Sequence, residues 1–263
     1  MPNLIAAHPA WKSPRSEVAP SRLSSSVVAR EQLTPADREE MYQLLESYFQ
    51  NTTPAQFAHD LAEKDIVILL RDPDDARIVG FSTLMTLELT LDDRPVVGFF
   101  SGDTIIAREY WGSSLLARLW ATTVFREADR IRQYAPETLF YWLLISSGYK
   151  TWRYLPTFFV DFQPHPERQP SPFDRQVLDR LAANKFGDDY DAATGIVRLR
   201  QANPLRHGVA EVTEQRLRDP LVEFFLRMNP GHAQGDELVC LVPIESANLT
   251  RAGLRMLNAG VPA

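Results

Sequence analysis

The 263-residue sequence has a single cysteine and no long apolar run. Cys240 excludes an intramolecular disulfide, and its place in the apolar run LVCLVPI is typical of a buried strand residue. No segment approaches the roughly 20 apolar residues that span a bilayer, and the N-terminus lacks the basic start and apolar core of a secretory signal. We therefore expect a cytoplasmic protein without a membrane span.

The sequence also has no excess of positive charge. Its 28 lysines and arginines against 34 aspartates and glutamates give a net charge of -6, which argues against a nucleic-acid binding surface. Five histidines are scattered without the spacing of metal ligands, so we expect no metal site. The motifs of P-loop proteins, α/β-hydrolases and Rossmann folds are missing too, which argues against those classes.

The composition, with 44% hydrophobic residues, is typical of a soluble globular protein, and the sequence contains clear start signals of helices and turn signals between strands. Residues 1–24 mix proline, serine and isolated charges, which predicts a flexible arm before a domain at 25–263. Thr34-Pro35 and Thr53-Pro54 are typical helix starts. The predicted order is a strand at 25–33, two helices, an antiparallel meander of DIVILL, IVGFSTLMTLEL and PVVGFFSGDTIIA, a helix after AREYWGSS, the strand LFYWLLI and a helix around GYKTWRYL.

This order predicts an α/β (α+β) fold whose central sheet is mixed and mostly antiparallel. The step from the third meander strand through the long helix to LFYWLLI is a crossover that makes two strands parallel. Where such strands splay at their carboxyl ends, a ligand cleft is expected beside the start of the helix. FFVDFQPHP and DELVCLVPI are typical of two further strands, and between them we expect a mainly helical insertion at 165–235.

The stretch EYWGSS resembles the donor-binding motif of the GNAT acyltransferase superfamily, with Glu109, Gly112 and Ser114 at the matching positions. The resemblance implies a splayed strand pair and an acyl-CoA whose pyrophosphate lies on the backbone amides at the helix start. It implies the following donor-binding residues: Ile105, Ile106, Ala107, Trp111, Gly112, Ser113 and Ser114.

Glu109 departs from the family pattern, because it places a negative charge where the family usually has a neutral or basic residue. The charge can be balanced by Arg108, Arg118 and Lys150. Alternatively, the acyl thioester arrives on an acyl carrier protein, whose pantetheine arm carries one phosphate. The resemblance leaves both donors open.

Two residues are candidates for catalysis. Asp103, in GFFSGDTIIA, is expected to share a face with Ser101 and Ile105, so that apolar neighbours raise its pKa and suit it to act as a general base. A structural role in a strand bulge is the alternative. In SGYKTWRY, the positions Ser147, Lys150 and Tyr154 resemble a second GNAT pattern, which implies that Tyr154 protonates the leaving thiolate. Lys150 is larger than the family residue, and ordinary ring packing is the alternative for Tyr154.

The resemblance therefore implies an N-acyltransferase that moves an acyl group from a CoA or carrier-protein thioester to an amine of a small molecule or peptide. The group ranges from acetyl to fatty acyl, because Trp152, Phe224 and Phe225 are able to line a tunnel or simply to form core. A GNAT-like binding or regulatory module without activity is the alternative.

Overall fold

The protein, described by a computed structural model over residues 23–209 and 211–258, is built on one sheet of eight strands in the order β1-β2-β3-β4-β5-β8-β7-β6. Strands β4 and β5 are parallel, and the other neighbouring pairs are antiparallel. The strands are β1 (Ser24–Ala29), β2 (Ile66–Arg71), β3 (Ile78–Leu91), β4 (Arg94–Ile106), β5 (Leu139–Ser146), β6 (Tyr190–Asp191), β7 (Ile196–Val197) and β8 (Glu237–Pro243). The predicted fold class is confirmed. Residues 1–22 of the predicted arm lie outside the described residues, and Ser24 already belongs to β1.

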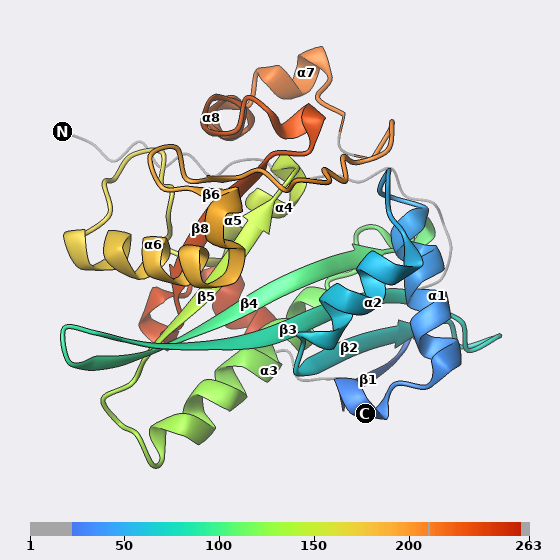
Figure 1. Cartoon of the computed structure of the whole chain (residues 1–263), viewed down its shortest axis with the longest axis horizontal. Helices are drawn as coiled ribbons and strands as arrows, with labels where there is room; N and C mark the ends of the chain where they lie inside the picture. The colour runs from blue at the N-terminus through green and yellow to red at the C-terminus, as the bar shows by residue number, and fades with distance from the viewer. Residues whose placement is uncertain (1–22, 210, 259–263) are drawn as a thin grey trace.

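Helices cover both faces of the sheet (Figure 1). The front face in Figure 1 carries α1 (Pro35–Glu46), α2 (Pro54–Ala62) and α6 (Pro172–Phe186). Behind the sheet lie α3 (Leu115–Arg132), which makes the crossover from β4 to β5, and α9 (Arg251–Asn258). The short helices are α4 (Tyr149–Trp152), α5 (Tyr154–Phe158), α7 (Glu214–Leu217) and α8 (Pro220–Met228). The predicted helix starts are confirmed, because Thr34 and Thr53 accept hydrogen bonds from the backbone N–H groups of Asp37 and Gln56.

The core lies on both sides of the sheet. On the α3 side, Phe99 and Trp142 pack with residues of α3, α4 and α8. On the other side, α6 packs on the middle of the sheet and α1 and α2 pack on β2 to β4. Helix α6 approaches β4 closely, because a Cβ on Gly98 would lie 2.8 Å from Cδ1 of Leu181. A side chain at position 98 would therefore displace Leu181.

The segment between α5 and β8 differs from its predicted form. The predicted strand at 158–166 is wrong, because α5 extends to Phe158 and only single bridges follow, at Phe159 and Gln163. Pro164 and Pro166 have no N–H group with which to continue a ladder. The described part of residues 165–235 contains the α-helices α6, α7 and α8 and the β6–β7 hairpin, which extends the sheet by pairing Ile196 with Leu238 of β8.

Residues 201–209, here called the strap, join this segment to the loop after α1. The N–H of Gln50 donates to the carbonyl of Pro204 at 2.9 Å, and the N–H of Arg206 donates to the carbonyl of Tyr48 at 2.8 Å. The strap then reaches the loop at the start of α3, where Arg108 donates to the carbonyl of Gly208 at 3.1 Å. Three distant parts of the chain thus meet beside the end of β4.

Candidate functional site

A gap opens between β4 and β5 at their carboxyl ends. The last residue pair that joins these parallel strands is Ser101 with Leu144. Beyond it β4 continues to Ile106 against β3 alone, whereas β5 continues to Ser146 against β8. The gap lies beside the start of α3, at the kind of position where open α/β sheets bind ligands.

A bulge in β4 sets the direction of Asp103. Ser82 pairs with Thr104 and Leu84 with Ser101, so that Gly102 and Asp103 both lie opposite Thr83. A Cβ on Gly102 would lie 2.7 Å from the Thr83 hydroxyl and 2.8 Å from Cε of Lys64. A side chain at position 102 would therefore displace Thr83 or Lys64.

The bulge also overturns one expectation. The predicted common face of Ser101, Asp103 and Ile105 is wrong, because an extra residue in the strand breaks the two-residue alternation. The Ser101 hydroxyl accepts a hydrogen bond from Nε1 of Trp142 at 2.8 Å on the α3 side. Ile105 is buried in the cluster under α1 and α2.

Asp103 is half-buried and carries a strongly perturbed carboxyl group. Burial raises its pKa, the negative charge and hydrogen bond of Asp60 raise it further, and the Lys64 ammonium opposes them, to give a pKa of about 7. Lys64 follows α2, and its fully buried Nζ lies 2.9 Å from Oδ1 of Asp60. The structure therefore surrounds the predicted base with two charged residues that sequence reasoning missed.

Glu237 adds a second carboxyl group to the gap. It is the first residue of β8, beside the end of β5, and the Ser147 hydroxyl hydrogen-bonds to it. Burial raises the pKa of Glu237 to about 7, with further contributions from the charges of Asp103 and Asp60. Sequence reasoning missed Glu237 as well, since nothing local distinguishes it from other strand-end glutamates.

A cavity of about 250 Å³ opens beside Ser147. Its walls include the strap residues 205–207 and the loop after α8, with His232. The buried Asn229 holds this loop to the sheet, because its Nδ2 donates to the carbonyls of Ser146 at 3.3 Å and of Asp236 at 2.9 Å. A second cavity, of about 320 Å³, lies beside His165 and Pro243 at the opposite end of β8, away from the gap.

Tyr154 is the first residue of α5, and its side chain is 42% exposed. Its ring lies 5.6 Å from that of Phe158, and partial burial raises its pKa. Among the described residues no hydrogen bond joins Tyr154 to Asp103 or to Ser147. Tyr149, the first residue of α4, is buried. The two predicted catalytic residues are therefore not in hydrogen-bond contact.

The predicted donor loop leads from β4 into α3. Ile105 and Ala107 are buried at the end of β4, a short turn covers Arg108–Tyr110, and Gly112 has a φ of +100° with open space where a Cβ would stand. The Ser113 hydroxyl accepts from the N–H of Leu115 at 3.3 Å, and Ser114 caps the helix without a side-chain bond. Gly112 thus brings the backbone into α3 with a positive φ, while the N–H groups of Trp111 and Ser113 donate to the carbonyls of Arg108 and Tyr110, at 3.1 Å each.

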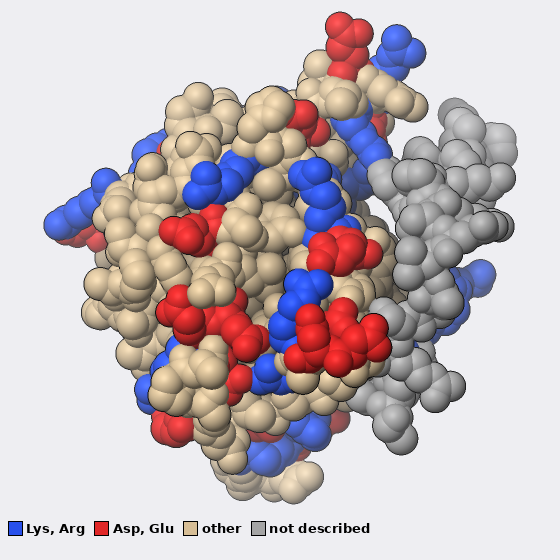
Figure 2. All heavy atoms as spheres, turned by 90° about the vertical axis from the view of Figure 1, so that its right-hand side faces the viewer, with Lys and Arg blue, Asp and Glu red and all other residues tan. Residues whose placement is uncertain are grey.

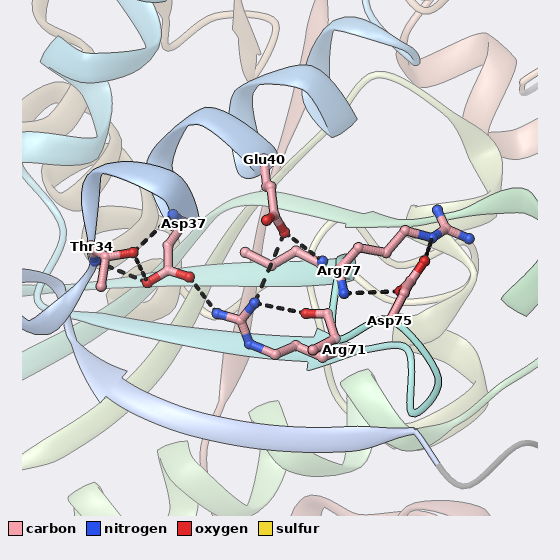
Figure 3. Close-up of polar contacts among 8 residues, drawn as sticks. Thr34, Asp37, Glu40, Arg71, Asp75 and Arg77 are labelled. Carbon is pink, nitrogen blue, oxygen red and sulfur yellow. Dashed lines mark hydrogen bonds and ion pairs between the residues drawn. The ribbon is translucent and has the colours of Figure 1, made fainter.

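Glu109 lies 3.1 Å from the Arg77 guanidinium, on the turn between β2 and β3. Its own backbone N–H and Arg77 lower the pKa of Glu109, so it is charged and balanced. Arg77 also contacts Asp75, in a turn that a network from Arg71 to Asp37 and Glu40 fixes to α1 (Figure 3). Acidic and basic side chains interleave on this side of the molecule (Figure 2).

Basic groups lie around Trp111. Its ring is 5.0 Å from the Arg108 guanidinium and 4.3 Å from Nζ of Lys150, and Nε1 donates to the carbonyl of Ile106 at 3.0 Å. Burial lowers the pKa of Lys150, and so do Arg108 and Arg216. One turn into α3, Nε of Arg118 is buried without a hydrogen-bond partner among the described residues.

Within residues 23–209 and 211–258, no group of three or more histidine, cysteine, aspartate or glutamate side chains is arranged to hold a metal ion. In the same part of the chain, no helix is both long and apolar enough to cross a membrane.

No protein-family model matches the chain, and no curated protein matches its sequence. Solved structures share parts of its fold. A conserved protein from Enterococcus faecalis, described as a probable N-acyltransferase, is 15% identical over 51% of this chain and 33% of its own, with a TM-score of 0.37. The chain thus matches only a third of that protein.

Two smaller proteins are similar over more of their own length. The GNAT family N-acetyltransferase YhbS from Escherichia coli, solved with CoA, is 17% identical over 55% of this chain and 72% of its own, with a TM-score of 0.33. An acetyltransferase from Trypanosoma brucei is 18% identical over 57% of this chain and 97% of its own, with a TM-score of 0.35. By its own strand order, parallel β4–β5 pair and α3 crossover, the chain has a GNAT-like fold.

Proposed function

We propose that the protein is an N-acyltransferase, which moves an acyl group from a thioester of CoA or of an acyl carrier protein to an amine of a small molecule or peptide. The observation that carries the proposal is the Asp103 carboxyl group, with a pKa of about 7, on a bulge in the gap between two parallel strands. A general base is most effective when its pKa lies near the working pH.

The nitrogen loses two protons on the way from ammonium to amide, and the leaving thiolate takes one up. The acceptor's ammonium group gives the first proton to Asp103, and its nitrogen attacks the thioester carbonyl carbon. The carbon–sulfur bond then breaks while the nitrogen gives its second proton to solvent, which leaves the amide. The thiolate then takes a proton, for which Tyr154 is the proposed donor. Placement of the amine supplies much of the rate, and the base adds roughly 10² to 10⁴.

The donor's phosphate is proposed to lie on the loop from Trp111 to Ser114. Support comes from the positive φ of Gly112, the eighteen-residue helix that starts after Ser114, and the Nε of Arg118, which has no hydrogen-bond partner in the described part of the chain. The pairing of Glu109 with Arg77 supports this too, because it balances the carboxylate charge that departs from the family pattern. A CoA pyrophosphate and the single phosphate of a carrier's pantetheine arm both suit this loop.

The acceptor is proposed to enter through the cavity beside Ser147, which lies next to Glu237. The acyl group is proposed to be short. Trp152 packs on Phe224 and Phe225 with ring centroids 5.3 and 6.4 Å apart, and all three are buried. The packing of these rings on one another as core supports a short acyl group.

The test is donor binding followed by turnover. Acetyl-CoA at 100 times its dissociation constant should stabilise the protein by about 2.7 kcal/mol, as measured by thermal unfolding. Asp103→Asn should bind the donor as well as the wild type and transfer the acyl group roughly 10² to 10⁴ times more slowly. Asp188→Asn, at an exposed aspartate, is the matched control and should keep full activity. If acetyl-CoA, longer acyl-CoAs and an acylated carrier all fail to bind, the chain is instead a GNAT-like module without this activity.

A further inference from the structure

The free edge of β4 ends in a backbone carbonyl that points into the gap. The N–H of Ala107 donates to the carbonyl of Val79 on β3 at 2.7 Å. Hydrogen-bonding groups alternate in direction along a strand, so those of Ile106, one residue earlier, point away from β3. Strand β5 stops pairing with β4 at Ser101, so the Ile106 carbonyl lies on the edge that β5 has left.

The side chain of Trp111 is hydrogen-bonded to this carbonyl. Its Nε1–H donates to the oxygen of Ile106 at 3.0 Å, although the side chain is 39% exposed. An exposed tryptophan does not need an internal partner, since water satisfies its N–H. The contact therefore covers a backbone group that an incoming ligand would otherwise meet.

The residues that hold the indole also hold the strap. Arg108 lies over the Trp111 ring and donates to the carbonyl of Gly208, and Lys150 lies over the ring and donates to the carbonyl of Val209 at 2.5 Å. The ring of Tyr48, whose carbonyl accepts from the strap, is 6.4 Å from that of Trp111. The indole is thus held in place from several sides.

We propose that Trp111 gates the donor site. Its indole N–H donates to the Ile106 carbonyl, where an amide N–H of the bound donor would donate instead, so the indole must move away before the donor binds. The proposal rests on the proposed function. A pantetheine arm is an extended chain with two amides, and such chains bind to open strand edges through their backbone-like groups. Trp111 therefore favours thioesters whose amide replaces the hydrogen bond that the indole gives up.

The experiment compares Trp111→Phe with the wild type, using acetyl-CoA as the probe in calorimetry. Phenylalanine keeps an aromatic face for Arg108 and Lys150 and removes only the competing N–H. The variant should bind acetyl-CoA about fivefold to tenfold more tightly, the net effect of one hydrogen bond. Trp120→Phe is the matched control, because its Nε1 has no partner among the described residues, and it should leave the affinity unchanged.

A second readout follows the indole itself. In ¹⁵N spectra the Trp111 indole resonance, identified by its loss in Trp111→Phe, should be protected from solvent exchange in the free protein and should lose that protection when acetyl-CoA is added. If the wild type binds acetyl-CoA and Trp111→Phe binds it equally well or more weakly, the indole only lines the site. That result overturns the proposed gate, while the proposed function stands. If neither protein binds acetyl-CoA or an acylated carrier, the proposed function fails and the gate fails with it.

Discussion

The buried ammonium of Lys64 lies 2.9 Å from the carboxylate of Asp60, and this ion pair lies against the β4 bulge that carries Asp103. The two residues come from the end of α2, so a helix at one side of the sheet controls the charge in the gap. Asp60 raises the pKa of Asp103, whereas Lys64 lowers it.

Asp60→Asn should move the pH dependence of acyl transfer to lower pH. In the wild type the rate should rise with pH and level off above about 7, as Asp103 loses its proton. Asparagine removes one of the groups that raise this pKa and leaves Lys64, so the midpoint should fall by about one unit. Glu63→Gln is the control, since Glu63 lies on the same helix end and pairs with Lys185. An unchanged midpoint in Asp60→Asn would show that another group limits the rate.

Asp103→Asn should make stability less dependent on pH. The folded-state pKa of Asp103 is raised from 3.8 to about 7, so ionisation costs stability as the pH rises from about 4 to about 7. Asparagine does not ionise, so the free energy of unfolding of the variant should rise relative to that of the wild type across this window. The difference should reach up to about 4 kcal/mol above pH 7. Urea unfolding at pH 5 and pH 8 measures the difference. Asp188→Asn should show no such trend, and a constant difference for Asp103→Asn would contradict the raised pKa.

Lys64→Met should destabilise the fold. The substitution keeps most of the buried chain and removes the cation nearest to Asp60, which leaves Asp60 next to Asp103 with only the longer pairing to Lys185, at 3.9 Å. Asp60 is partly exposed, so the expected loss is about 2 kcal/mol, below that of a fully buried pair. The double variant Asp60→Asn, Lys64→Met should recover part of the loss in thermal unfolding. Purely additive effects would show that the pair does not interact.

Gly112→Ala and Gly187→Ala should separate backbone strain from donor binding. Both glycines have positive φ and open space for a Cβ, so each substitution should cost about 1 to 3 kcal/mol through backbone strain alone. Only Gly112→Ala should also weaken acetyl-CoA binding, since Gly187 follows α6, away from the loop. Equal donor affinity in the two variants would move the donor away from this loop.

Local signals predicted much of the fold. Thr34 and Thr53, each followed by proline, gave two correct helix starts, and the alternation of strands and turns gave the meander and the crossover. The predicted strand at 158–166 is wrong because Phe158 is the last residue of α5. The β6–β7 hairpin was missed because each strand has only two residues, too few for a visible alternation.

The site was less visible, because it depends on contacts between distant residues. Asp103 stood out in an apolar strand, but the bulge that turns it is a matter of register between β3 and β4. Glu237 and Asp103 are 134 residues apart and meet only through the strand order of the sheet. Asp60 and Lys64 did carry a local signal, an acidic and a basic residue four apart, but nothing in that spacing shows burial.

Because Leu181 rests on the bare backbone of Gly98, α6 is fixed to the centre of the sheet. A shortened protein that joined residue 164 to 236 would uncover the apolar side chains of Phe100, Tyr141 and Leu143, and would expose the edge of β8. In engineering terms the segment 165–235 cannot be cut out to enlarge the opening, and any change to the proposed acceptor site has to come from substitutions of its side chains in place.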